Sequence, residues 1–226
     1  ANIFNQGIRN MVLDREEELS QGDILMIVKN NYYWMEEERK KLSEERRVKS
    51  EEFNCLANHK VQSSNLKVQS NHKVQSSKFK VQSNEIPAFL ANGDRAKVLK
   101  VRRRIDLYGF RFATLLLQFP DYGNYELEAT VLLDTLTSEA PALTHEQQEQ
   151  LFHQIEEDYQ DIPLKADRMK AIRQDQFFNA LQVKFAYAVT CHKAQGGQWA
   201  HVYVDQGYMT DDMLNPDYIH WLYTAF

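Results

Sequence analysis

The stretch AYAVTCHKAQGGQW, residues 186–199, places polar side chains and glycines directly after an apolar run. An ordinary strand-to-helix turn needs one capping residue and one glycine, whereas this stretch offers Thr190, His192 and Lys193 together with two glycines. Backbone N–H groups at a helix start, a hydroxyl and a cation bind phosphate, and glycines let the backbone approach a ligand closely. The stretch therefore indicates contact with a polar, phosphate-bearing ligand.

Two other chemistries fit the same stretch less well. It is not a Walker A loop, because the pattern G-x-x-x-x-G-K-[ST] does not occur in the 226 residues. Cys191 beside His192 resembles a thiol nucleophile with its base, but adjacent residues on a strand point to opposite faces and no third orienting residue is evident. We therefore interpret Cys191 as a small buried apolar residue. For His192, a turn histidine bonded to backbone stays open.

A basic run, KVLKVRRR at residues 97–104, is the second candidate site. A solvated strand face is its default interpretation, and phosphate contact that is independent of sequence and sensitive to salt is the alternative. The net charge of −5 argues against a protein that coats nucleic acid by bulk electrostatics, but it leaves room for a local basic groove. The cations with a candidate role are Lys97, Lys100, Arg102 and Arg103.

Short strands and turns in the first part of the chain predict a small β-barrel. Strand-forming runs lie at residues 22–34, 111–119 and 125–133, and a tight-hairpin signal, Asn-Gly-Asp, lies at residues 92–94. Residues 35–54 carry both charge signs at i to i+4 spacing, which predicts a solvated helix. Strands joined by hairpin turns are typical of barrels.

The last third alternates helix and strand, which indicates a parallel α/β layer. We expect helices at residues 144–159, 165–179 and 216–226, and strands at residues 180–190 and 201–205. Ligands of such sheets bind at the carboxyl ends of the strands, and residues 190–198 lie at such an end. We call residues 190–198 the coupling segment.

The N-terminal sequence NIFNQGIRNMV predicts an amphipathic helix whose apolar face holds Ile3, Phe4, Ile8 and Val12. It reads as the middle of a helix, and the first residue is Ala, so we expect the chain to be a piece of a longer protein. Two distant cysteines, no signal peptide and no long apolar run predict a cytoplasmic protein without a membrane partner.

Imperfect KVQS repeats occupy residues 59–84, with units that start at Lys60, Lys67, Lys73 and Lys80. Their alternating spacing of seven, six and seven residues lacks the steady register of a heptad, so we interpret them as a flexible insertion. A weak nucleic-acid-binding arm is the alternative, because the run holds five lysines and no acidic residue. His59 and His72 lack a ligand pattern, and no metal site is predicted.

The sequence YAVTCHKAQGGQWAHVYVD, followed by YIHWLYTAF, resembles the C-terminal motor lobe of RecD-like superfamily 1 DNA helicases, the exonuclease V alpha-subunit type. In that family T-x-H-K-x-Q-G forms motif V and Y-T-A-x-T-R forms motif VI. GDILMIVKNNYYW and FLANGDRAKV resemble strands of the small Src-homology-3-like barrel inserted in this lobe. The implied fold is α/β, a RecA-like parallel-sheet motor lobe with an inserted β-barrel. Its parts are the start of the lobe at 1–17, the barrel at 18–137 with the insertion at 35–85, and the rest of the lobe at 138–226.

The resemblance also implies roles for single residues. Thr190, His192 and Lys193 contact single-stranded DNA or relay the nucleotide state to it, and the basic run contacts DNA on the barrel. Gln195, Gly196 and Gln198 lie at ATP, with Gln198 where more distant relatives have Glu. Tyr223 and Thr224 begin motif VI, and the sequence ends at Phe226 before the motif's arginine. For Trp199, Trp221 and Tyr223, core packing is preferred over base stacking.

The implied activity is ATP-dependent translocation on single-stranded DNA, 5′ to 3′, in repair or recombination. ATP and Mg²⁺ are expected mainly on a missing N-terminal motor lobe that supplies Walker A and Walker B, so the chain alone is expected to be inactive. That lobe, single-stranded DNA and other subunits of a repair complex are the expected partners. A non-catalytic DNA- or protein-binding module built on the barrel stays open as the alternative.

Overall fold

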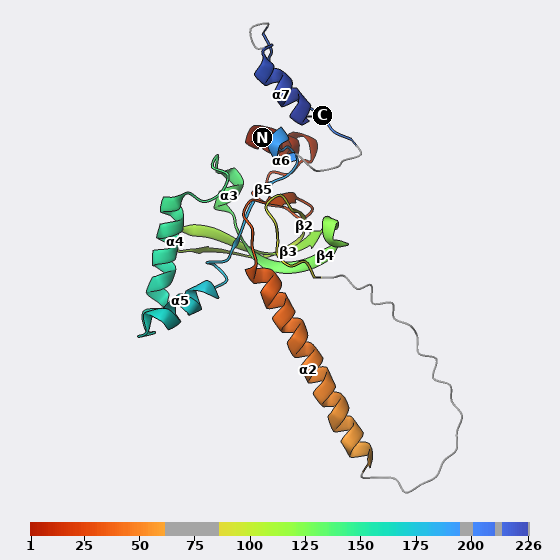
Figure 1. The fold of residues 1–226 in the computed structure, drawn as a ribbon, viewed down its shortest axis with the longest axis vertical. Helices are drawn as coiled ribbons and strands as arrows, with labels where there is room; N and C mark the ends of the chain where they lie inside the picture. Colours follow the sequence, from red (N-terminus) through yellow and green to blue (C-terminus); the bar gives the residue numbers. More distant parts are fainter. Residues whose placement is uncertain (62–85, 195–200, 211–213, 226) are drawn as a thin grey trace, which may run out of the picture.

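A closed barrel of five strands forms the centre of the protein (Figure 1). The computed structural model describes residues 1–61, 86–194, 201–210 and 214–225. The strands are β1 Ile24–Ile27, β2 Arg95–Leu107, β3 Phe110–Phe119, β4 Tyr125–Leu132 and β5 Leu181–Phe185. Neighbours pair antiparallel except β4 and β5, which run parallel. The predicted small barrel is therefore confirmed.

The helices are distributed unevenly around the barrel. They are α1 Asn2–Gly7 with a π-helical continuation η1 Ile8–Val12, α2 Tyr33–Val61, α3 Asp134–Thr137, α4 His145–Asp158, α5 Lys165–Arg173, α6 Cys191–Ala194 and α7 Pro216–Ala225, with a 3₁₀ turn η2 at Pro120–Tyr122. In Figure 1, α4 and α5 cover one side of the barrel and α2 projects away from it. The short α6 packs against α7 at the end of the molecule opposite the free end of α2.

Strand β2 bends around the barrel at two β-bulges. Register shifts against β3 lie between Val98 and Lys100 and between Val101 and Arg103. Each bulge adds an unpaired residue and increases the local twist, which lets a long strand curve around a small barrel. Tyr108 and Gly109, with φ of 57° and 73°, form the two-residue turn into β3.

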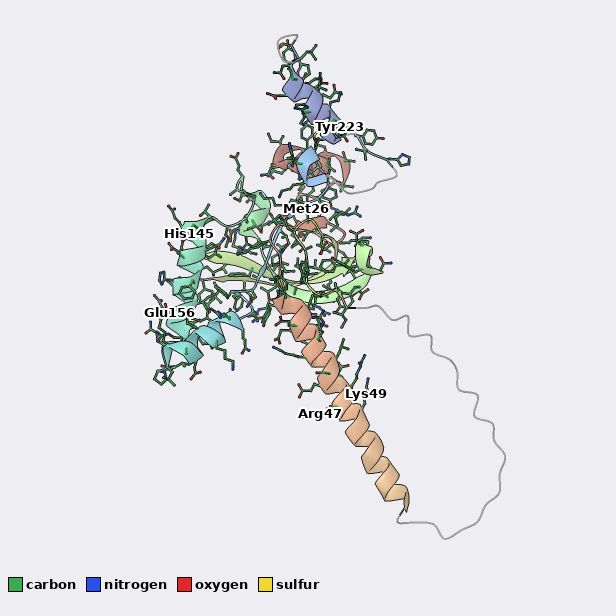
Figure 2. All side chains as sticks on the ribbon, in the orientation of Figure 1. Met26, Arg47, Lys49, His145, Glu156 and Tyr223 are labelled. Carbon is green, nitrogen blue, oxygen red and sulfur yellow. The ribbon has the colours of Figure 1, made fainter. Side chains whose placement is uncertain are left out.

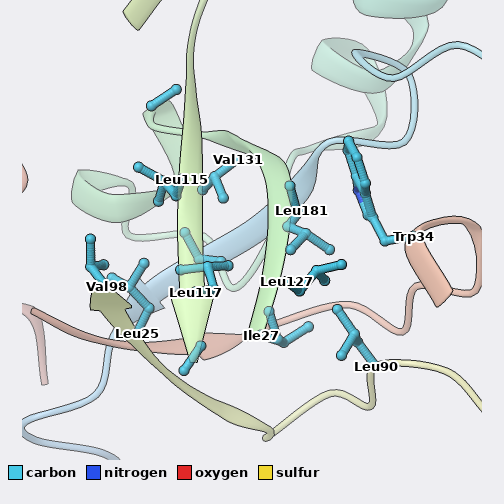
Figure 3. Close-up of a cluster of buried hydrophobic side chains, with 14 of the residues drawn as sticks. Leu25, Ile27, Trp34, Leu90, Val98, Leu115, Leu117, Leu127, Val131 and Leu181 are labelled. Carbon is cyan, nitrogen blue, oxygen red and sulfur yellow. The ribbon is translucent and has the colours of Figure 1, made fainter. Parts of the chain in front are cut away.

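The barrel interior is filled by alternate residues of its strands (Figure 3). On β3, Leu115, Leu117 and Phe119 are fully buried, whereas the residues between them are half-buried on the outer face. Trp34, at the start of α2, packs into the same core, and its Nε1–H donates to the Asn179 carbonyl oxygen at 2.9 Å. A second cluster holds α4 and α5 against the β2–β3 hairpin: Phe110, Phe112, Leu132, Leu143, Leu151, Ile155 and Ile172.

Several predicted helices are confirmed, with adjusted ends. Thr144 caps α4 with a complete capping box, accepting from the Gln147 amide while Gln147 accepts from the Thr144 amide. The charged helix begins at Tyr33, and the ion pairs described on it, such as Glu37 with Lys40, are spaced i to i+3. The KVQS repeats beyond Val61 lie outside the described residues.

Three strand predictions were wrong in extent or position. The predicted strand at residues 22–34 is the four-residue β1, and residues 201–205 form no strand. The predicted strand at residues 180–190 is shorter, and as β5 it pairs with β1 and β4 instead of lying in a separate sheet. An open barrel leaves two edges with unpaired backbone groups, and β5 satisfies both. A RecA-like parallel sheet is not seen in the part of the chain that the structure describes.

Candidate nucleic-acid interface

The start of the coupling segment lies on the surface as a short helix. Thr190, His192 and Lys193 are all exposed, and the Thr190 carbonyl accepts from the amides of Lys193 at 2.9 Å and Ala194 at 3.1 Å. Cys191 is half-buried, so its interpretation as a buried apolar residue was wrong. The polar side chains of α6 are thus available to a ligand.

The predicted nucleotide-facing residues are not among the described residues. Gln195, Gly196, Gln198 and the neighbouring Trp199 lie outside the described residues. Their assignment stays a prediction.

The two residues that begin the motif VI pattern lie on α7, next to α6. Tyr223 is 88% exposed (Figure 2), and the Thr224 hydroxyl donates to the His220 carbonyl at 3.0 Å. Trp221 is half-buried and stacks on Tyr218 with ring centroids 5.9 Å apart. Core packing was therefore a wrong prediction for Tyr223, whose ring lies on an exposed face of α7.

The bulges of β2 bring three cations of the basic run onto one face. Lys97, Lys100 and Arg103 are exposed, although residues 97 and 100 point to opposite faces in a regular strand. Their pairing partners on β3 are Gln118, Leu116 and Thr114, which alternate along the outer face of that strand. Within the described part of the chain, these three cations make no ion pair.

Arg102 differs from these three cations because it is already paired. Its Nε lies 3.2 Å from Glu128 on β4, and both side chains are exposed. The structure thus separates the predicted basic residues into a row of three, which we call the β2 cation row (Lys97, Lys100 and Arg103), and one arginine with a counter-charge.

Sequence reasoning missed a buried lysine below the coupling segment. Lys184 on β5 is 9% exposed, and its Nζ donates to the Ser138 carbonyl, which also accepts from the Asn2 side chain at 2.9 Å. Burial lowers the pKa of Lys184, and the nearby charge of Lys193 lowers it further. The only signal in the sequence was one charge inside an otherwise uncharged strand.

The N-terminal helix buries the face opposite to the predicted one. Asn5 and Arg9 are 3% and 4% exposed, whereas Ile3, Phe4 and Val12 are 84%, 54% and 74% exposed. Hydrogen bonds decide this orientation, because Asn5 and Arg9 bond to the chain beside β5 and β1. The helix was therefore predicted correctly, but the prediction of which of its faces is buried was wrong.

Asp23, just before β1, is the centre of a buried polar cluster. Its carboxylate is fully buried and accepts both arms of the Arg9 fork, from Nε at 3.1 Å and Nη2 at 2.9 Å. It also accepts from Arg15 Nη1 at 2.7 Å, the Tyr187 hydroxyl at 2.7 Å and the Ser20 amide at 2.7 Å. We call Asn5, Arg9, Arg15, Asp23 and Tyr187 the Asp23 junction.

Backbone and ring contacts complete the Asp23 junction. Gly22 has φ of 85°, and a Cβ there would lie 2.9 Å from Arg15 Nη2, so only glycine permits the approach of Arg15. The Arg9 guanidinium lies over the Phe185 ring, 4.3 Å from its centroid. These contacts tie the N-terminal helix and β5 to the entry of β1.

The electrostatics of the cluster favour an ionised carboxylate. Burial by itself raises the pKa of Asp23, but the hydrogen bonds from Arg9, the Ser20 amide, Tyr187 and Arg15 outweigh burial and leave the pKa below its ordinary 3.8. Burial, followed by the bond to Asp23, raises the pKa of Tyr187 to about 12. At neutral pH the carboxylate is therefore charged and the phenol is a donor.

The described residues contain neither a membrane-spanning helix nor a metal-binding group. None of the described helices is both long and apolar enough to cross a bilayer. No group of three or more His, Cys, Asp or Glu side chains in that part of the chain could hold a metal ion.

The C-terminal part of the chain matches a known protein family. Residues 185–226 match the family model of the UvrD-like helicase C-terminal domain. The matched range begins at the last residue of β5 and includes the coupling segment and α7. It supports a helicase-related function and DNA binding. No curated protein matches the chain.

Proposed function

We propose, from the match of residues 185–226 to a helicase C-terminal domain, that the chain is the second motor lobe of an ATP-dependent DNA helicase. The enzyme would move 5′ to 3′ on single-stranded DNA in repair or recombination, in the manner of RecD-like helicases. The observation that carries the proposal is that the matched range contains the exposed Thr190, His192 and Lys193 and the adjacent α7. A repair complex with further subunits, as in exonuclease V, is part of the same proposal.

The nucleotide side of the site is assigned to Gln195, Gly196 and Gln198. The described part of the chain offers no ligand set for Mg²⁺, and the sequence has no Walker A pattern, so we assign most of the ATP and Mg²⁺ contacts to a first lobe. That lobe is the expected partner of this chain.

The DNA side has two parts, Lys193 on α6 and the β2 cation row. Both carry exposed cations, and a cation that contacts a phosphate releases a counterion from the DNA. Because the net charge of the chain is −5, binding has to depend on such local clusters rather than on bulk attraction.

Removal of the β2 cation row should weaken the salt dependence of single-stranded DNA binding. Each phosphate contact contributes about 0.7 to the slope of log K against log salt, so Lys97→Gln, Lys100→Gln and Arg103→Gln together should lower the slope by about 2. Fluorescence anisotropy with a labelled oligonucleotide over a salt series measures the slope. An unchanged slope would remove the row from the DNA path.

The chain offers a control with the same change of charge. Lys40→Gln, Lys41→Gln and Arg47→Gln also remove two lysines and one arginine, but from the exposed face of α2, which projects away from the barrel (Figure 2). We expect this variant to keep the slope of the parent chain. An equal decrease of the slope in both variants would mean that the salt dependence follows from net charge alone.

Lys193→Ala separates the motor-lobe proposal from the alternative of a non-catalytic module on the barrel. The exposed β2 cation row, which makes no ion pair within the described residues, favours that alternative. If Lys193→Ala weakens DNA binding, the coupling segment belongs to the DNA site. If only removal of the β2 cation row weakens DNA binding, a non-catalytic binding module on the barrel is the better description.

The chain alone should not hydrolyse ATP, with or without single-stranded DNA. The reason is that no G-x-x-x-x-G-K-[ST] loop is present in its 226 residues to hold the β- and γ-phosphates. Phosphate release is the measurement, with a Walker A ATPase as the positive control. Turnover above the rate without protein would contradict the assignment of the ATP contacts to a first lobe.

A further inference from the structure

The four successive residues 185–188 connect the end of β5 to the coupling segment. Each of them is paired with or hydrogen-bonded to the barrel, its entry or the N-terminal helix. Phe185 pairs with Leu25 in the barrel, and the Ala186 amide donates to the Ile24 carbonyl at 2.9 Å. The Tyr187 hydroxyl donates to Asp23. Ala188 exchanges two hydrogen bonds with the Asn5 side chain, at 2.7 Å and 2.9 Å.

These bonds end just before the residues assigned to DNA. Thr190 lies two residues beyond Ala188, and an extended chain of that length spans at most about 7 Å. The position of Ala188 therefore restricts the position of Thr190 to within that distance. Asn5 belongs to α1 and Asp23 to the entry of β1, so two separate elements determine the position of Ala188.

We propose that the Asp23 junction is a positioning device that holds the start of the coupling segment relative to the barrel and the N-terminal helix. Tyr187 and Asn5 are its positioning residues, since both act on Thr190–Lys193 through the intervening backbone. A displacement of the barrel or of α1 then moves these residues, whatever ligand they bind. What the segment binds rests on the proposed function, whereas the positioning itself does not.

The Tyr187 hydroxyl is the specific part of this device. It donates to Asp23 and accepts from Arg15 Nη1 at 2.6 Å and from the Ile24 amide at 3.2 Å. Its ring stacks on Phe185 with centroids 6.4 Å apart. Tyr187→Phe keeps the ring and removes these three bonds, so it loosens the segment without a cavity in the barrel.

Cys191 provides a direct readout, because it is half-buried and adjacent to Thr190. In a Cys55→Ser background it is the single thiol, and its rate of reaction with a disulfide reagent reports local opening of the segment. We expect Tyr187→Phe to raise that rate at least about fivefold, because one buried hydrogen bond already corresponds to a factor of that size and three bonds are lost. Asn5→Ala should raise it as well, since both bonds to Ala188 are lost.

Tyr122→Phe is the matched control. The Tyr122 hydroxyl donates to Asp94 at 2.7 Å, so this variant also removes a tyrosine–aspartate bond, but at the β3–β4 connection. We expect a measurable loss of stability to urea, and a Cys191 rate within about twofold of the parent. Equal Cys191 rates in the two variants would overturn the proposal and leave Tyr187 a merely structural residue.

Anisotropy with single-stranded DNA on the same variants separates this inference from the proposed function. A raised Cys191 rate in Tyr187→Phe, in a chain that never binds DNA, would keep the positioning device and remove the proposed ligand. If the parent binds DNA and the Cys191 rate does not change in Tyr187→Phe, the proposed ligand stands and the positioning device is contradicted.

Discussion

Asp23→Asn is expected to lower the free energy of unfolding by about 3 to 5 kcal/mol, because it leaves the buried guanidinium of Arg9 without its counter-charge. Arg9 is 4% exposed and Asp23 is fully buried, so water cannot replace the lost carboxylate. The amide also offers one oxygen where the carboxylate accepts bonds from two arginines, a hydroxyl and an amide. Urea unfolding followed by circular dichroism measures the change.

Asp121→Asn is the control, because Asp121 also accepts both arms of an arginine fork but lies on the surface. Arg95 bonds Asp121 with both arms of its fork, at 3.3 Å and 2.8 Å, and both side chains are more than a third exposed. An exposed pair is worth at most about 1 kcal/mol. The two variants therefore differ in the burial of the carboxylate and in the additional bonds that Asp23 accepts from Arg15, Ser20 and Tyr187. A stability of Asp23→Asn close to that of Asp121→Asn would contradict the structural role of the junction.

Leu117→Ala should cost about 2 to 5 kcal/mol, because Leu117 fills the barrel interior and its loss leaves a cavity. Thermal or urea unfolding measures this effect. The expected loss is large because the closed barrel cannot collapse around the gap without breaking strand pairing.

The neighbouring residue on the same strand is the control for this variant. Leu116 is half-buried on the outer face, where water fills the space that its side chain leaves, so Leu116→Ala should cost about 1 kcal/mol or less. Equal losses at residues 116 and 117 would contradict the burial of Leu117 in the core, since only the interior and outer faces of β3 distinguish these two neighbours.

Local patterns were sufficient where short-range physics determines an element. The alternation in FRFATLLLQF, the cap at Thr144 and the paired charges after Tyr33 depend on neighbours a few residues away, and the corresponding β3, α4 and α2 form as predicted. Exposure of Lys97 and Lys100 on one face required the β2 bulges, whose positions depend on how the strand curves around the barrel. The sequence placed these cations on a strand, and it did not show which of them share a face.

The sequence by itself determined the strands β3 and β4, the main helices and the polar composition of the coupling segment. Tertiary structure alone decided that β5 closes the barrel and that α1 and η1 bury Asn5 and Arg9 instead of Ile3 and Phe4. The reason is the same in both cases. Buried backbone groups and charges need partners, and here those partners are far away in the sequence, as Ala188 is from Asn5. Hydrophobic spacing carries no information on such pairs, so the support of the coupling segment became visible only in the folded chain.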